Sequence, residues 1–129
     1  MEFLYYFANA SLTQRVLNYL LRQLDSCIDS ATVIFLNDRW VVDVKLNLEV
    51  DDERNEDCWA FFSENGTPYH PGLSITSALN ALNTGLTPTQ VMSQYHIAIV
   101  SRGKPDPQEV ACFQKQVIEG LGYCPETLA

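Results

Sequence analysis

The fold is decided by residues 32–50, which read TVIFLNDRWVVDVKLNLEV. A continuous apolar run ends at Leu36, and Asn37-Asp38 follows it, a dipeptide that favours a two-residue hairpin turn. Over residues 42–50 apolar and polar side chains then alternate, which is the pattern of a strand with one buried face and one solvated face. The stretch therefore predicts a hairpin and, around it, an antiparallel sheet.

Working outward, aromatic and β-branched residues predict further strands over residues 2–8 and 58–62. Residues 96–100 either end the preceding helix or form a strand, and their β-branched side chains favour the strand. Helices are predicted from capping signals and apolar periodicity over residues 11–28, 74–83, 87–95 and 106–121. We expect one α+β domain over residues 1–129, with an antiparallel β-sheet of about four strands and three or four helices packed mainly on one face.

The chain is acidic, with a formal net charge of −8 and a pI near 4.5. Eight Lys and Arg side chains are too few for a basic face, so we expect no direct nucleic acid binding and no attraction to anionic membrane. The first ten residues lack the basic start and long apolar run of a signal peptide, which predicts a cytoplasmic protein. A basic protein partner is the ligand class that this charge favours.

The acidity is concentrated in one segment, residues 43–64, which holds eight acids and two bases, a net charge of −6. We predict that this hairpin region and the turn after it dock on a basic partner, with two tryptophans nearby as aromatic anchors. A solvated segment that serves solubility alone is the alternative. The predicted partner-binding residues are Asp43, Glu49, Asp51, Asp52, Glu53, Glu56, Asp57, Trp40 and Trp59.

A second hypothesis is a small metal-dependent hydrolase or nuclease. Asp38, Asp43 and Lys45 resemble two metal-binding carboxylates and a water-orienting lysine on a hairpin. Their spacing is tight, and cross-strand pairing explains Asp43 and Lys45 equally well. A Cys/His pair is a further catalytic possibility, but no nucleophile elbow or phosphate-binding loop accompanies it. We therefore predict no catalytic residues, no metal and no cofactor.

The cysteines, Cys27, Cys58, Cys112 and Cys124, lack metal-binding spacing. Cys27 and Cys112 fall in predicted helices, so we expect both thiols to be buried.

The function predicted from the sequence is a small non-enzymatic protein-binding module, in the form of an inhibitor that occupies a basic protein surface, such as one that binds nucleic acid. Immunity proteins of bacterial toxins and phage-encoded anti-defence proteins belong to this general class of small acidic inhibitors. A structural subunit that assembles through its sheet edge or helices is a third hypothesis. The oligomeric state stays open.

Overall fold

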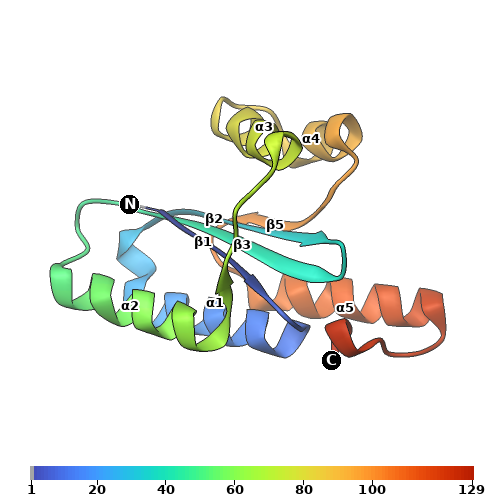
Figure 1. Cartoon of the computed structure of the whole chain (residues 1–129), viewed down its shortest axis with the longest axis horizontal. Coiled ribbons are helices and arrows are strands. Elements are labelled where there is room, and N and C mark those ends of the chain that lie inside the picture. The colour runs from blue at the N-terminus through green and yellow to red at the C-terminus, as the bar shows by residue number, and fades with distance from the viewer. Residues whose placement is uncertain (1) are drawn as a thin grey trace.

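The computed structural model describes residues 2–129, which form a five-stranded antiparallel sheet with helices on both faces (Figure 1). The α+β prediction is confirmed. In chain order the elements are β1 (Glu2–Phe7), α1 (Ala10–Leu24), η1 (Asp25–Cys27), β2 (Ile28–Leu36), β3 (Arg39–Leu46), α2 (Asp52–Asn65), β4 (Thr67–Pro68), α3 (Leu73–Asn83), α4 (Pro88–Tyr95), β5 (Ala98–Gly103), α5 (Pro107–Leu121) and η2 (Glu126–Leu128).

The sheet order is β4-β1-β3-β2-β5, and every strand pair is antiparallel. The predicted hairpin joins β2 to β3. Asn37 and Asp38 have φ angles of 51° and 60°, the left-handed conformation that a tight hairpin turn requires at both central residues. The hairpin places β3 at the centre of the sheet.

Two helical layers cover the sheet. Figure 1 shows α1, α2 and α5 below it, and α3 and α4 above it. Alternate residues of β3 serve the two layers, because Trp40 and Val42 lie in the larger core while Val41 packs with α3 and α4. The prediction of a wet sheet face is therefore wrong: β3 ends at Leu46, and Asp43 on its polar face is buried.

The strand predicted over residues 58–62 is also wrong, because these residues belong to α2. Cys58 and Phe62 are four residues apart, so both point from one helix face into the core. The Phe62 ring lies 5.4 to 5.9 Å from three aromatic rings of β1. The ring of Phe61 stacks on Tyr19 of α1 at 4.1 Å. The aromatic residues suggested a strand, but a helix places Phe62 against β1 and Phe61 against α1.

Local signals place most other boundaries. Thr87 and Gln90 form the predicted capping box of α4, and Asp106 caps α5 with Pro107 at its first position. The α1 helix starts earlier than predicted, because its capping side chain is that of Asn9, which accepts a hydrogen bond from the Leu12 amide. The predicted strand near residues 96–100 is present as β5.

Candidate functional site

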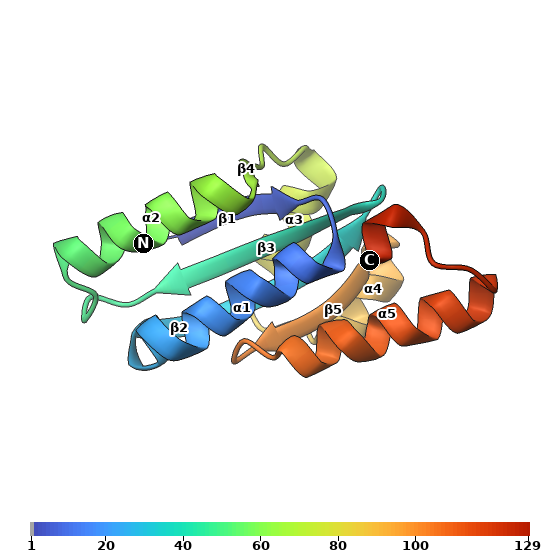
Figure 2. The same ribbon diagram turned by 90° about the horizontal axis from the view of Figure 1, so that it is seen from below.

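Most of the acidic segment lies on α2 and on the loop before it. α2 runs along the β1 side of the sheet, on the same face as α1 (Figure 2). The residues predicted to form a charged turn, 51–57, instead form the N-terminal cap and first turns of this helix. Carboxylates near a helix N-terminus are favoured by the helix dipole, which gives the acidic run a local reason to be helical.

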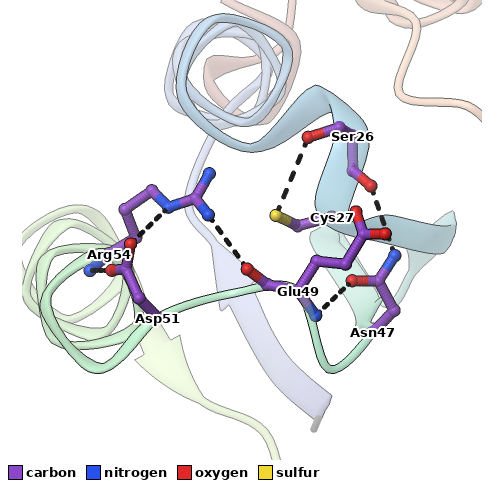
Figure 3. A network of polar contacts seen from close by, with 6 residues as sticks. All are labelled: Ser26, Cys27, Asn47, Glu49, Asp51 and Arg54. Carbon is purple, nitrogen blue, oxygen red and sulfur yellow. Dashed lines mark hydrogen bonds and ion pairs between the residues drawn. The ribbon is translucent and has the colours of Figure 1, made fainter.

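Hydrogen bonds hold the loop that enters α2 (Figure 3). The Asn47 side chain donates to the Ser26 carbonyl at 3.2 Å and accepts from the Glu49 amide at 2.9 Å. The Arg54 guanidinium donates to the Glu49 carbonyl at 3.0 Å and to the Asp51 carboxylate at 3.1 Å. Arg54, the one basic side chain of α2, thus holds the loop that precedes the helix.

Asp51 is the N-terminal cap of α2, and its carboxylate accepts from the Arg54 amide at 2.8 Å. This bond and the Arg54 guanidinium hold the pKa of Asp51 below its usual value. Asp51 is therefore a structural cap as well as part of the negative charge, and its substitution would confound a test of binding.

The outward side of α2 carries acids around an exposed tryptophan. Trp59 is 59% exposed although it is the largest type of side chain. Glu56 precedes it by three residues, which places both side chains on the same strip of the helix. We define the acidic surface as the exposed residues Glu49, Asp52, Glu53, Glu56, Asp57 and Trp59. No basic side chain of α2 other than Arg54 opposes this charge.

Besides the capping residue Asp51, two of the predicted partner-binding residues do not belong to this surface. Trp40 is fully buried, and its indole N–H donates to the Thr127 carbonyl at 2.8 Å. Its ring packs against Phe35 and Phe113 in the core. Asp43 is 3% exposed in the central strand. Neither side chain can contact a partner in this fold, so both predictions are corrected.

Asp43 is a buried carboxyl with one oxygen, Oδ1, that has no hydrogen-bond partner among the described residues. Burial, reinforced by the neighbouring Glu2 carboxyl, raises the pKa of Asp43 to about 8, against the weaker opposing effects of Lys45 and Arg102. Arg102 itself donates to the Thr32 hydroxyl at 2.7 Å. Asp43 is therefore mostly neutral at pH 7.

The structure also gives the hydrolase hypothesis no support. Asp38 lies in the hairpin turn, roughly 15 Å along the strand from Asp43 at about 3.3 Å per residue. Among residues 2–129, no cluster of three or more His, Cys, Asp or Glu side chains could hold a metal ion. Cys58 is a poor nucleophile, because burial raises its pKa to about 12.

Sequence reasoning missed one feature of this region. Strand alternation predicts that Leu48 is buried, but β3 has already ended and Leu48 is fully exposed beside Glu49. No periodicity could have found this, because the alternation continues unbroken past the end of the strand.

No protein-family model and no curated protein matches the chain. The solved crystal structure of the C-terminal domain of YpbH is similar, with a TM-score of 0.50 and 15% sequence identity over 89% of this chain and 97% of that domain. At this identity the likeness extends to the fold alone. Within residues 2–129, no helix is both long and apolar enough to cross a membrane.

Proposed function

We propose that the protein is a non-enzymatic binding module whose acidic surface on α2 docks on a basic surface of a protein partner. The observation that carries the proposal is Trp59, which is exposed on the strip of α2 that also carries the exposed carboxylates of Asp52 and Glu56. An exposed indole ring beside carboxylates is typical of an aromatic anchor at an interface.

The chemistry of the partner follows from the surface. Arginine side chains fit best, because a guanidinium can stack on an indole ring and pair with a neighbouring carboxylate such as Glu56. Complementary charge also speeds association and makes it sensitive to salt. Occupation of a nucleic-acid-binding channel is the inhibitory form of this function, since an array of carboxylates can compete with phosphates for the same basic side chains.

The test uses two double variants with the same change in net charge. Asp52→Lys with Glu56→Lys reverses charge on the acidic surface, and Glu119→Lys with Glu126→Lys reverses it at exposed positions elsewhere. Immobilised wild-type protein should retain a basic partner from a lysate of its source cells. The first double variant should lose that partner, and the second should retain it.

Trp59→Ala gives the sharper measurement once a partner is captured. The aromatic anchor should contribute about 2 kcal/mol or more to binding, or roughly thirtyfold in Kd. Tyr123→Ala, which removes another exposed aromatic ring, is the matched control and should leave Kd unchanged. Equal binding by both double variants would mean that the acidity acts only through total charge, and the proposal would fail.

A further inference from the structure

A second surface lies at the opposite edge of the sheet from α2. β5 is the last strand in the order β4-β1-β3-β2-β5 and pairs with β2 alone. Among residues 2–129 no strand pairs with its outer edge. Such an edge presents backbone N–H and C=O groups that can accept a further strand.

A groove lined by residues of β5 and α5 lies beside this edge. Figure 2 shows the two elements side by side. The volume of the groove is about 550 Å³. The wall on the α5 side is built from Glu109, Cys112, Phe113 and Gln116, which recur at helical spacing along one face of the helix, and the β5 side contributes Ile99 and Val100. An edge strand with an apolar trough beside it offers backbone pairing and side-chain pockets together.

The charge in the groove is negative at one end. Asp106 and Glu109 lie where β5 gives way to α5. Glu109 forms no ion pair among the described residues, whereas nearby Lys104 is paired with Asp25 at 3.5 Å. β5 ends where α5 begins, so a strand that adds antiparallel to β5 would have its N-terminus at this end of the groove. Its first residue would meet the two carboxylates.

The edge itself favours a flexible occupant. A register shift between β2 and β5 leaves Val100 without a partner on β2, as in a β-bulge. Two bulged edges from two copies would match poorly, and a net charge of −8 on each copy opposes their association. A short unfolded segment can adjust to the bulge.

We propose that the β5–α5 groove binds an extended peptide segment of a partner protein, which adds antiparallel to β5 as a sixth strand. The peptide places apolar side chains against Val100 and Phe113, on the sheet face that carries α5, and sets a basic residue at its N-terminal end against Asp106 and Glu109. This site is separate from the acidic surface on α2 and does not depend on the function proposed for it.

The probe is a fluorescein-labelled hexapeptide, blocked at both ends, of sequence Lys-Val-Thr-Val-Thr-Val. Fluorescence anisotropy with the full chain should show saturable binding. Moving the lysine to the last position, or replacing it with glutamate, should weaken binding by about tenfold, because either change removes a charge-assisted contact at the acidic end. Replacing the central valine with proline should also weaken binding, since proline cannot donate to the strand ladder.

Matched variants locate the site. Cys112→Trp fills the groove, while Cys124→Trp adds the same ring at another exposed cysteine outside it. Glu109→Lys reverses the charge at one of the two acidic positions in the groove, while Glu119→Lys makes the same change farther along α5. The first member of each pair should weaken peptide binding about tenfold or more, and the second should not. Asp52→Lys with Glu56→Lys should leave it unchanged, which separates this site from α2.

Alkylation gives an independent readout without any substitution. Bound peptide should slow the reaction of Cys112 with a maleimide and leave Cys124 at its free rate. The proposal is overturned by an absence of binding at millimolar peptide, by equal binding of the two tryptophan variants, or by insensitivity to the position of the lysine. A dimer in light scattering that Cys112→Trp dissociates would assign the edge to self-association, and it would equally overturn the peptide site.

Discussion

The Asp43 carboxyl lies in the central strand, flanked by Leu4 on β1 and Thr32 on β2. It points to the sheet face that carries α3 and α4, and its Oδ1 atom has no hydrogen-bond partner within residues 2–129. A carboxylate in such a place is strongly disfavoured, because desolvation is not offset by a complete set of hydrogen bonds. The neutral acid is tolerated far better, so the protonation state of one residue sets part of the stability of the sheet.

This environment predicts that stability falls as pH rises. An unfolded aspartate ionises near pH 4, while the folded pKa of Asp43 is about 8. Between these values unfolding releases a proton, so the free energy of unfolding decreases with pH. The contribution of neutral Asp43 is complete below pH 4 and lost above pH 8. We expect Asp43→Asn, which cannot ionise, to gain about 2–5 kcal/mol in stability relative to the wild type between pH 5 and pH 9 in urea unfolding.

Asp38→Asn is the control for this measurement, because Asp38 is exposed in the hairpin turn and asparagine also tolerates its positive φ. Its stability relative to wild type should be nearly the same at both pH values. If Asp43→Asn also gives one constant difference at pH 5 and pH 9, the Asp43 carboxyl ionises in the folded protein as it does in water.

The two tryptophans show what residue-level reasoning can and cannot do. Trp40 precedes the acidic segment in the sequence and Trp59 lies within it, and both were predicted at its surface. Strand alternation sends Trp40 inward with Val42, whereas the exposure of Trp59 depends on α2 being a helix. Because residues 58–62 were predicted as a strand, there was no sound reason to expect Trp59 to be exposed. Trp59 nevertheless remains part of the acidic surface.

At the scale of elements, predictability follows from how local each signal is. The β2–β3 hairpin, the capping box of α4 and the start of α5 are specified by neighbouring residues, and all three were predicted. α2 is specified by distant contacts, because Phe62 packs on rings from β1 and Phe61 stacks on α1. Over residues 58–62 tertiary packing overrides strand propensity, because the local helix signals, the Asp51 cap and the carboxylates after it, lie at the N-terminal end of α2.

The end of α2 offers a test of this packing. A methyl group at Gly66 would lie 2.5 Å from the Phe7 ring and 2.7 Å from the Tyr6 carbonyl, both on β1. Gly66→Ala must therefore push the helix end away from the sheet, and we expect a loss of about 1–3 kcal/mol in urea unfolding.

Gly120→Ala is the matched control, because the same methyl group on α5 meets nothing within 4 Å. It should stabilise the protein by up to about 1 kcal/mol through higher helix propensity. Two substitutions of the same kind are thus expected to have opposite signs. A neutral Gly66→Ala would show that α2 does not approach β1 this closely.

At the scale of the whole molecule, the sheet separates two candidate binding surfaces. α2 contacts β1 and β4 on one side of the sheet order, and α5 contacts β5 on the other. The sequence indicated the first surface through its charge. It could not indicate the second, because the groove exists only once β5 is known to be terminal and α5 to lie beside it. A partner on one edge should therefore leave the other edge accessible.

The four cysteines report on the integrity of the whole fold. Cys27 and Cys58 are fully buried, in η1 and α2, while Cys112 and Cys124 are exposed. The burial expected of Cys27 is confirmed, and that of Cys112 is wrong because its side chain lines the groove on α5. In the native protein at pH 8, we expect two thiols to react rapidly with a chromogenic disulfide reagent. The other two should react at least about a thousandfold more slowly, since core thiols become accessible mainly through global opening.

Single Cys→Ser variants at the exposed positions should each remove one rapidly reacting thiol, while denaturing urea should make all four react together. Because Cys27 adjoins β2 and Cys58 faces β1, fast reaction of either thiol would require local opening on that side of the larger core. Such opening would contradict a core held together by β1, α1 and α2, since those elements share the aromatic contacts of Phe62 and Phe61. Slow reaction of both thiols, with equal rates, is the result that a single cooperative unit requires.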